Sequence, residues 1–156
     1  MEVRIIDLPR VTIAYQRHIG PYGPAIGTFW RGTFSPWLAA NGLTGRPCYG
    51  IGHDDPSATP PDQCRYDAGV EIPDDLDVQA PSMRAVLPGG RYAVAQFKGA
   101  AAAIGDAWMQ LCREWLPASD WQHDARPWFE YYPEDFSVDA KTGEFYCELC
   151  IPVCPR

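Results

Sequence analysis

The sequence is poor in basic residues. Its 156 residues include 13 Lys and Arg against 20 Asp and Glu, which gives a formal net charge of −7 at pH 7. An acidic chain without a basic stripe has no general electrostatic attraction for nucleic acid or for anionic membrane surfaces. We therefore expect no direct binding of nucleic acid.

Long hydrophobic runs are also absent. A membrane-spanning helix needs about 18 or more consecutive apolar residues, and no stretch of this kind occurs. The first ten residues, MEVRIIDLPR, carry several charges and no long apolar segment, so they do not look like a secretory signal peptide. The sequence therefore predicts a cytoplasmic protein without a membrane partner.

Metal-binding patterns are sparse, although six cysteines are present. Reduced thiols are expected rather than disulfides, because no export signal is seen. The C-x-x-C pair Cys147 and Cys150 lies in CELCIPVC, which has the pattern of a strand, where residues three apart point to opposite faces. No second such pair occurs and the histidines are scattered. We predict no metal site and no cofactor, and interpret the cysteines as small core residues.

What the chain does contain is an internal repeat. AIGTFWRGTFSPWLAANG, from Ala25, resembles AIGDAWMQLCREWLPASD, from Ala103, at an offset of 103 − 25 = 78. RPCYGIGHDD, from Arg46, resembles RPWFEYYPED, from Arg126, at an offset of 126 − 46 = 80. VEIP and LCIP match in the same order, and chance explains this poorly. The sequence predicts a single domain, residues 1–156, with pseudo-repeats at about 1–73 and 82–156 and a linker at 74–81.

Each repeat has the pattern strand, helix, strand, strand. Apolar residues alternate over 11–19 and recur at helical spacing over 21–40 and 101–116, with Pro36 predicting a kink or break in the first helix. RYAVAQFKG (91–99) has the place of 11–19 in the second repeat, and the remaining strands are expected at 46–53, 65–72, 128–132 and 144–153. Two such units, paired about a pseudo-twofold axis, predict an α+β fold: a curved antiparallel sheet of about eight strands with two helices.

The two repeats differ at two acidic positions. Glu130 aligns with Gly50 at the offset of 80, and Glu148 aligns with Gly69 at an offset of 148 − 69 = 79. In both cases a carboxylate stands in the second repeat where the first has no side chain. A ligand site need not repeat in a duplicated scaffold, so these positions are the candidates for function.

Both acids have aromatic neighbours. Strand alternation places Trp128 and Tyr132 on the face of Glu130, and Tyr146 on the face of Glu148. A desolvated carboxylate favours a cationic partner, to which aromatic rings add cation–π attraction, or it gains a raised pKa suited to acid–base catalysis.

Simpler roles for these residues remain open. Either acid could face water, or pair with Arg84 or Arg91. The tryptophans of the two helices are interpreted as core residues. Trp108 is the one that could lie at the edge of a crevice between the halves.

Several stretches together resemble a known family, the GyrI-like small-molecule-binding domains. These domains occur alone in DNA gyrase inhibitors and as effector-binding domains of multidrug-responsive regulators. The matching stretches are HIGPY (18–22), DDPSATPPDQCRYDAGVEIP (54–73), LPGGRYAVAQFKG (87–99), RPWFEYY (126–132) and CELCIPV (147–153). The resemblance implies a tandem strand–helix–strand–strand fold. It also implies that Glu130 and Glu148 line an aromatic pocket for lipophilic, often cationic, ligands.

The chain departs from the family pattern in two ways. Cys150 stands where relatives commonly carry an aromatic residue, and no helix-turn-helix flanks the domain, which argues against direct control of transcription.

We therefore predict a protein that binds small hydrophobic or cationic aromatic ligands for sensing, sequestration or xenobiotic resistance. The predicted ligand-binding residues are Glu130, Glu148, Tyr132, Tyr146, Trp128 and Trp108.

An enzyme is the first alternative. The resemblance extends to hydrolases that open cyclopropane-bearing, DNA-alkylating natural products. Glu148 or Glu130 would then be catalytic, activating water while Tyr132 or Tyr146 orients it or donates a proton. A second alternative is a protein-interaction role, with gyrase or a transcriptional regulator as the partner.

Overall fold

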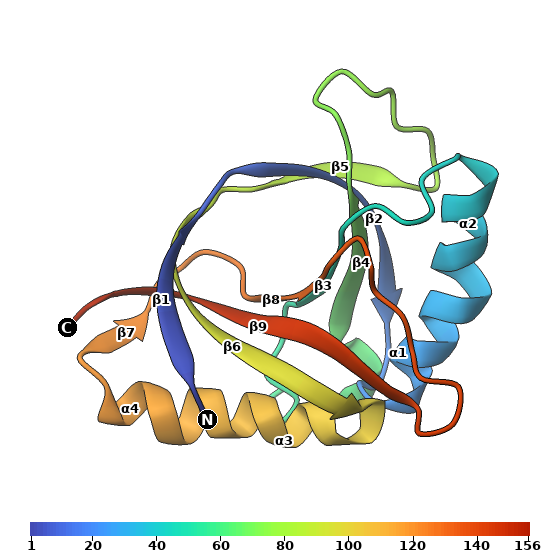
Figure 1. Cartoon of the computed structure of the whole chain (residues 1–156). Helices are drawn as coiled ribbons and strands as arrows, with labels where there is room; N and C mark the ends of the chain where they lie inside the picture. The colour runs from blue at the N-terminus through green and yellow to red at the C-terminus, as the bar shows by residue number, and fades with distance from the viewer.

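The structure, a computed structural model, describes all residues from 1 to 156 and contains one antiparallel sheet and two long helices (Figure 1). The sheet has nine strands: β1 (Val3–Leu8), β2 (Val11–Ile19), β3 (Cys48–Gly52), β4 (Arg65–Glu71), β5 (Met83–Leu87), β6 (Gly90–Ala100), β7 (Trp121–His123), β8 (Phe129–Tyr132) and β9 (Glu144–Pro155). The helical segments are α1 (Pro24–Phe29), η1 (Trp30–Phe34) and α2 (Ser35–Ala40), then η2 (Pro61–Gln63), then η3 (Ala101–Ala103), α3 (Ile104–Met109), η4 (Gln110–Trp115) and α4 (Leu116–Ala118). The α+β class expected from the sequence is confirmed.

The strand order reveals the duplication. The order is β1-β6-β9-β8-β3-β4-β2-β5, with β7 attached to β9. It reads the same in reverse when β1 exchanges with β5, β2 with β6, β3 with β8 and β4 with β9. A pseudo-twofold axis therefore passes between the central strands β3 and β8. Each half contains the predicted strand–helix–strand–strand unit.

A further strand precedes each unit and was not expected. β1 pairs with β6, and β5 pairs with β2, so the first strand of each half completes the sheet of the other half. Both strands lie at the edges of the sheet, where one side has no neighbouring strand. Their exposed positions blur the apolar alternation that identifies a half-buried strand, which explains why the pattern missed them.

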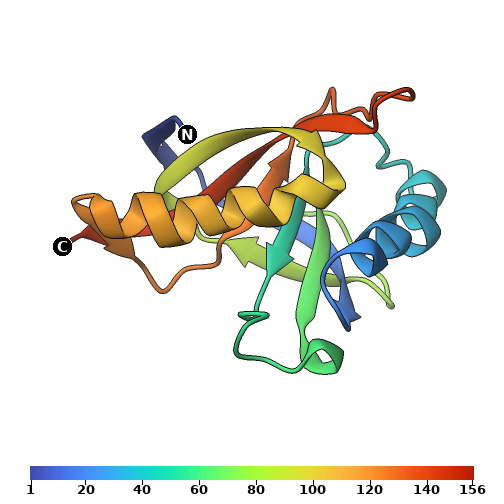
Figure 2. The same cartoon turned by 90° about the horizontal axis from the view of Figure 1, so that it is seen from below.

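The sheet curls, and the two helices pack on its outer side (Figure 1). Figure 2 shows α3 and α4 running across the strands, with α1 and α2 at the other end of the sheet. Two apolar clusters lie between helices and sheet, around Phe34 in the first half and Leu111 in the second. A third cluster, around Tyr92, fills part of the curled interior. Because both faces are covered, neighbouring residues such as Ile13 and Ala14 are both fully buried.

Each long helix contains a π-helical turn that ends just before a proline-containing pair. η1 is followed by Ser35 and Pro36, and η4 is followed by Leu116 and Pro117. A proline within a helix removes one backbone donor and crowds the preceding turn. The wider π-helical turn accommodates this without breaking the helix. The irregularity expected at Pro36 therefore occurs one turn earlier, and the second helix has a corresponding π-helical turn that was not expected.

Candidate functional site

Glu130 lies on the pseudo-twofold axis. In the β3–β8 register it is directly opposite Gly50, its own counterpart in the first half. A Cβ atom on Gly50 would overlap the hydroxyl of Tyr66 and would lie 2.8 Å from Glu130 Oε1. Since both residues compete for one space at the axis, the fold accommodates a single large side chain there. The glycine leaves room for the acid, as the repeat indicated.

The carboxylate of Glu130 is enclosed by aromatic donors. Trp108 Nε1 donates to Oε2 at 3.0 Å, while the hydroxyls of Tyr132 and Tyr66 donate to Oε1 at 2.8 and 3.2 Å. Trp30 Nε1 in turn donates to the Tyr66 hydroxyl at 3.1 Å. Trp30 and Trp108 are repeat counterparts at the offset of 78, so one tryptophan from each helix reaches the axis. The residue as a whole is 8% exposed.

No basic residue pairs with this acid. None of the seven ion pairs in the structure includes Glu130. Burial raises the pKa of Glu130, and the hydrogen bonds from Trp108, Tyr132 and Tyr66 oppose that rise without cancelling it. The same enclosure, together with the charge of Glu130, raises the pKa of both phenols. The site therefore favours either a protonated Glu130 or a positive charge beside it.

The remaining walls of this site are aromatic. Trp128 packs against Trp108 with ring centroids 4.8 Å apart, and Tyr132 packs against Trp30 at 5.7 Å. Trp128 occupies space left by Gly52, because a Cβ atom there would overlap its ring. We call Glu130, Tyr66, Trp30, Trp108, Trp128 and Tyr132 the axial site. Four of the six ligand-binding residues predicted from the sequence belong to it.

The other two predicted residues, Glu148 and Tyr146, are on the opposite face of the sheet. Tyr131 is the residue opposite Glu148 in the β8–β9 register, whereas Glu130 is opposite Leu149. The Glu148 side chain is 22% exposed and lies 3.6 Å from Arg4. Tyr146 is exposed. One ligand cannot contact both acids while the sheet separates them.

The ion pairs considered as alternatives, between Glu130 or Glu148 and Arg84 or Arg91, do not form. Arg84 donates to the backbone carbonyls of Asp74 and Leu76, and Arg91 pairs with Asp7.

The register also corrects the alignment of Glu148. Tyr131 corresponds to Ile51 at the offset of 80, and Ile51 lies opposite Asp67. The structural counterpart of Glu148 is therefore Asp67 rather than Gly69, and the first half does carry an acid at this position. A shift of two residues keeps every side chain on the same face, so the alternation alone could not detect the error.

Asp67 is a structural residue. Its side chain is 5% exposed and binds both Arg17 and His53, the latter at 2.6 Å. Burial raises its pKa, but the bonds from His53 and Arg17 outweigh this and leave the pKa below its usual value.

A pocket occupies the curled interior and has a volume of about 280 Å³. The residues that line it are Ile6, Leu8, Pro9, Val11, Tyr49, Glu71, Leu87, Gly89, Tyr92, Val94, Phe129, Tyr131, Glu148 and Cys150. We call it the interior pocket. The sequence interpretation missed Glu71, although its place two residues after Gly69 on β4 puts it on the same face as Asp67.

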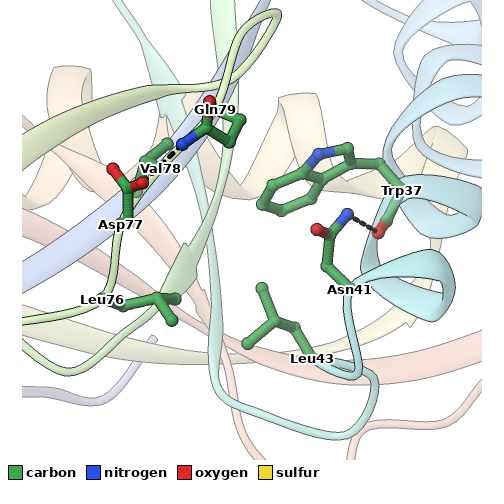
Figure 3. A pocket seen from close by; sticks show the side chains of 7 residues that line it. All are labelled: Trp37, Asn41, Leu43, Leu76, Asp77, Val78 and Gln79. Carbon is green, nitrogen blue, oxygen red and sulfur yellow. Dashed lines mark hydrogen bonds between the residues drawn. The ribbon is translucent and has the colours of Figure 1, made fainter.

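A smaller hollow lies between the end of α2 and the loop after β4 (Figure 3). Trp37, Asn41 and Leu43 face Leu76 and the segment 77–79 across it, and its volume is about 70 Å³. Ligand pockets for drug-sized molecules are about 300–1,000 Å³. We interpret this hollow as a packing defect.

Cys147 and Cys150 point to opposite faces of β9, one into the helix-covered core and one into the interior. All six cysteines are free thiols, and no cluster of three or more potential metal ligands occurs in the chain. None of the helices is both long and apolar enough to cross a membrane.

The fold and the axial site together make a duplicated α+β domain with a carboxylate held among aromatic side chains. The sequence model of the GyrI-like small molecule binding domain matches residues 1–153. The chain therefore belongs to the GyrI-like family, as the sequence resemblance indicated.

Curated relatives cover nearly the whole chain. A putative transcriptional regulator YosT, derived from prophage SPbeta of Bacillus subtilis, is 32% identical over 98% of this chain and 99% of its own length. A DNA gyrase inhibitor of Edwardsiella ictaluri is 31% identical over 98% of both chains.

Solved structures share the fold at low identity. The C-terminal domain of EcmrR superimposes with a TM-score of 0.78 at 15% identity, over 99% of this chain and 98% of that domain. In the EcmrR–DNA complex this chain covers 58% of the EcmrR chain. SAV2435 bound to tetraphenylphosphonium superimposes with a TM-score of 0.67 at 17% identity, over 99% of this chain and 94% of the SAV2435 chain.

Proposed function

We propose that this protein binds lipophilic cations at the axial site, with Glu130 as the anion that selects them. The observation that supports this is a buried carboxylate that has three neutral donors and no cationic partner. An unpaired buried charge is costly, and ordinary core packing gives no reason to keep it. A cationic ligand would supply the missing charge.

The aromatic walls fit the same ligand class. A cation placed among Trp30, Trp108, Trp128 and Tyr132 gains cation–π attraction from ring faces in addition to its attraction to Glu130. The site is filled by its own side chains, so a ligand must move at least one of them. Trp108 is the donor to displace, because it lies in the helix layer, whereas Tyr66 and Tyr132 belong to strands of the sheet.

The biological use that follows is sensing, sequestration or resistance to xenobiotics in the cytoplasm. The solved SAV2435 structure contains tetraphenylphosphonium, and EcmrR has been solved as a complex with DNA. By analogy, this chain would hold a lipophilic cation and act alone or with a regulator. Gyrase is a further partner to test, suggested by the name of the Edwardsiella ictaluri relative and by the net charge of −7.

The test is a comparison of tetraphenylphosphonium with tetraphenylborate, two ions of matched shape and opposite charge. Tryptophan fluorescence should report saturable binding of the cation and little binding of the borate. Glu130→Gln should weaken cation binding about 30-fold or more, since loss of a buried charge partner costs about 2 kcal/mol or more. Glu148→Gln, on the opposite face, is the matched control and should bind as the wild type does. Equal binding of both ions, or an unchanged Glu130→Gln variant, would refute the proposal.

Hydrolysis is the second candidate, favoured by the two phenols beside Glu130. Glu130 would take a proton from water as the water oxygen bonds to a carbon of a strained ring. The ring bond breaks, and Tyr132 protonates the carbon that receives the electron pair. The proton on Glu130 then returns to Tyr132, so the net reaction adds water. More than one equivalent of opened product per protein, lost in Glu130→Gln, would establish turnover over binding.

A further inference from the structure

The interior pocket is separate from the axial site. The two lie on opposite faces of the sheet, and Phe129 and Tyr131 face the pocket while Glu130 and Tyr132 face the helices. A molecule in the curled interior therefore contacts none of the axial residues except through the sheet. The volume of about 280 Å³ lies just below the range for drug-sized ligand pockets, about 300–1,000 Å³, so the pocket suits a small ligand.

Two carboxylates lie at one end of this pocket, close to the Tyr131 phenol. The pKa of Tyr131 is raised first by burial and then by the charges of Glu71 and Glu148. Tyr131 also lies opposite Glu148 on one side and opposite Tyr49 on the other. Glu71 raises the pKa of Tyr49 as well, after burial. Both acids therefore act on the Tyr131 phenol, and Glu71 acts on Tyr49 as well.

Glu71 is the acid without a partner. It is partly buried, and its carboxylate forms no ion pair and accepts no hydrogen bond, since Arg46 bonds to its backbone carbonyl instead. Glu148 has Arg4 at 3.6 Å, which balances its charge. The end of the pocket therefore holds about one uncompensated negative charge.

The other end of the pocket is apolar, and a neutralised cation lies over the ring of Tyr92, one of its lining residues. The guanidinium of Arg126 lies 4.9 Å from the Tyr92 ring, and it is bound by Asp124 and by the carbonyls of Gly89, Arg91 and Val153. Val153 is five residues from Glu148 along β9, about 17 Å at 3.4 Å per residue. The pocket thus has an acidic end and an apolar end. Leu8, Leu87, Val94 and Phe129 are among the walls that join them.

We infer that the interior pocket is a second ligand site, for a small lipophilic amine whose ammonium group binds Glu71. The hydrocarbon part extends along Leu87 and Phe129 toward Tyr92. An ammonium group carries donors for the carboxylate and for the Tyr131 oxygen, while the single uncompensated charge matches a monocation. This site differs from the axial site in face and in the acid that defines it.

The experiment uses 2-phenylethylamine, with 2-phenylethanol and 3-phenylpropionate as neutral and anionic controls of similar shape. Binding to the full chain is followed by calorimetry. The amine should bind and the two controls should bind at least about tenfold more weakly. Glu71→Gln should weaken the amine about tenfold or more, whereas Glu130→Gln, which changes only the axial acid, should leave binding of the amine in the interior pocket unchanged. Equal binding of amine and alcohol, or an unaffected Glu71→Gln variant, would overturn the inference.

A second measurement covers the case in which Glu71→Gln is poorly folded. In the wild type, the amine should shift the methyl resonances of Leu8 and Leu87 and leave the indole N–H resonance of Trp108 in place, because that N–H reports on Glu130. Shifts confined to Trp108 would assign the amine to the axial site and contradict a second site. Tetraphenylphosphonium, tested in the same way, should shift the Trp108 indole resonance. The proposal for the axial site and the proposal for the interior pocket are therefore tested by separate resonances, and either can be refuted without the other.

Discussion

Glu130 and Glu148 lie on neighbouring strands and nearly opposite each other, yet their surroundings differ completely. Glu130 is beneath the helices with three aromatic donors, and Glu148 is in the curled interior beside Arg4. The register places them one residue apart, which is sufficient to put them on opposite faces. The face of the sheet on which the side chain lies, rather than the local sequence, determines which acid is desolvated and which is partly paired with a surface arginine.

The largest effect in this comparison should come from the glycines. Gly50→Ala places a Cβ atom against Glu130 and against the Tyr66 hydroxyl, which a rigid ring holds in place. The substitution should cost about 1–3 kcal/mol of folding free energy. Gly69→Ala meets only the flexible end of Ile13, at 2.9 Å, and should cost about 1 kcal/mol or less. Urea unfolding of the two variants measures the difference. Equal costs would contradict the tight packing at the axis.

The pH dependence of stability should report the burial of Glu130. Burial raises the pKa of Glu130 in the folded state above the ordinary 4.5, so the folded protein holds its proton more tightly than the unfolded chain. The stability that Glu130 contributes is complete below pH 4.5 and is lost as pH rises through the folded pKa.

Urea unfolding between pH 4 and 8 tests this directly. The wild type should lose stability relative to Glu130→Gln as pH rises, and parallel profiles for these two proteins would be inconsistent with the burial of an unpaired carboxyl group. Glu148→Gln provides the reference on the other face.

A smaller effect should separate the neighbouring tyrosines of β8. Tyr132→Phe removes a hydrogen bond of 2.8 Å to Glu130 and should cost about 1 kcal/mol. The Tyr131 side chain faces the interior, and its hydroxyl makes no hydrogen bond to protein, so Tyr131→Phe should change stability by no more than about 0.5 kcal/mol. Thermal unfolding of both variants checks the contrast. A larger loss for Tyr131→Phe would mean that the faces are assigned the wrong way round.

The sequence predicted much of this arrangement because its information was local or repeated. The helices, the central strands and the shared face of Trp128, Glu130 and Tyr132 follow from periodicity, and the fold class follows from the duplication. β1 and β5 were missed because edge strands need little regular alternation.

The partition of the six predicted residues between two sites depends on which face the helices cover. Long-range packing determines which face the helices cover. The alternation of residues in a strand shows which side chains share a face, but it does not show which face that is. Glu71 was missed for a related reason, since a single acid at a strand end has no distinguishing pattern.

The central claim is that Glu130 is a desolvated carboxyl group without a cationic partner in the free protein, and that it binds a cationic ligand. The most direct measurement is an NMR titration of the Glu130 side-chain carboxyl carbon, assigned with Glu130→Gln, in the free protein and with tetraphenylphosphonium. The account predicts a pKa above 4.5 in the free protein that falls when the cation binds. A pKa at or below 4.5 that does not respond to the cation would contradict it.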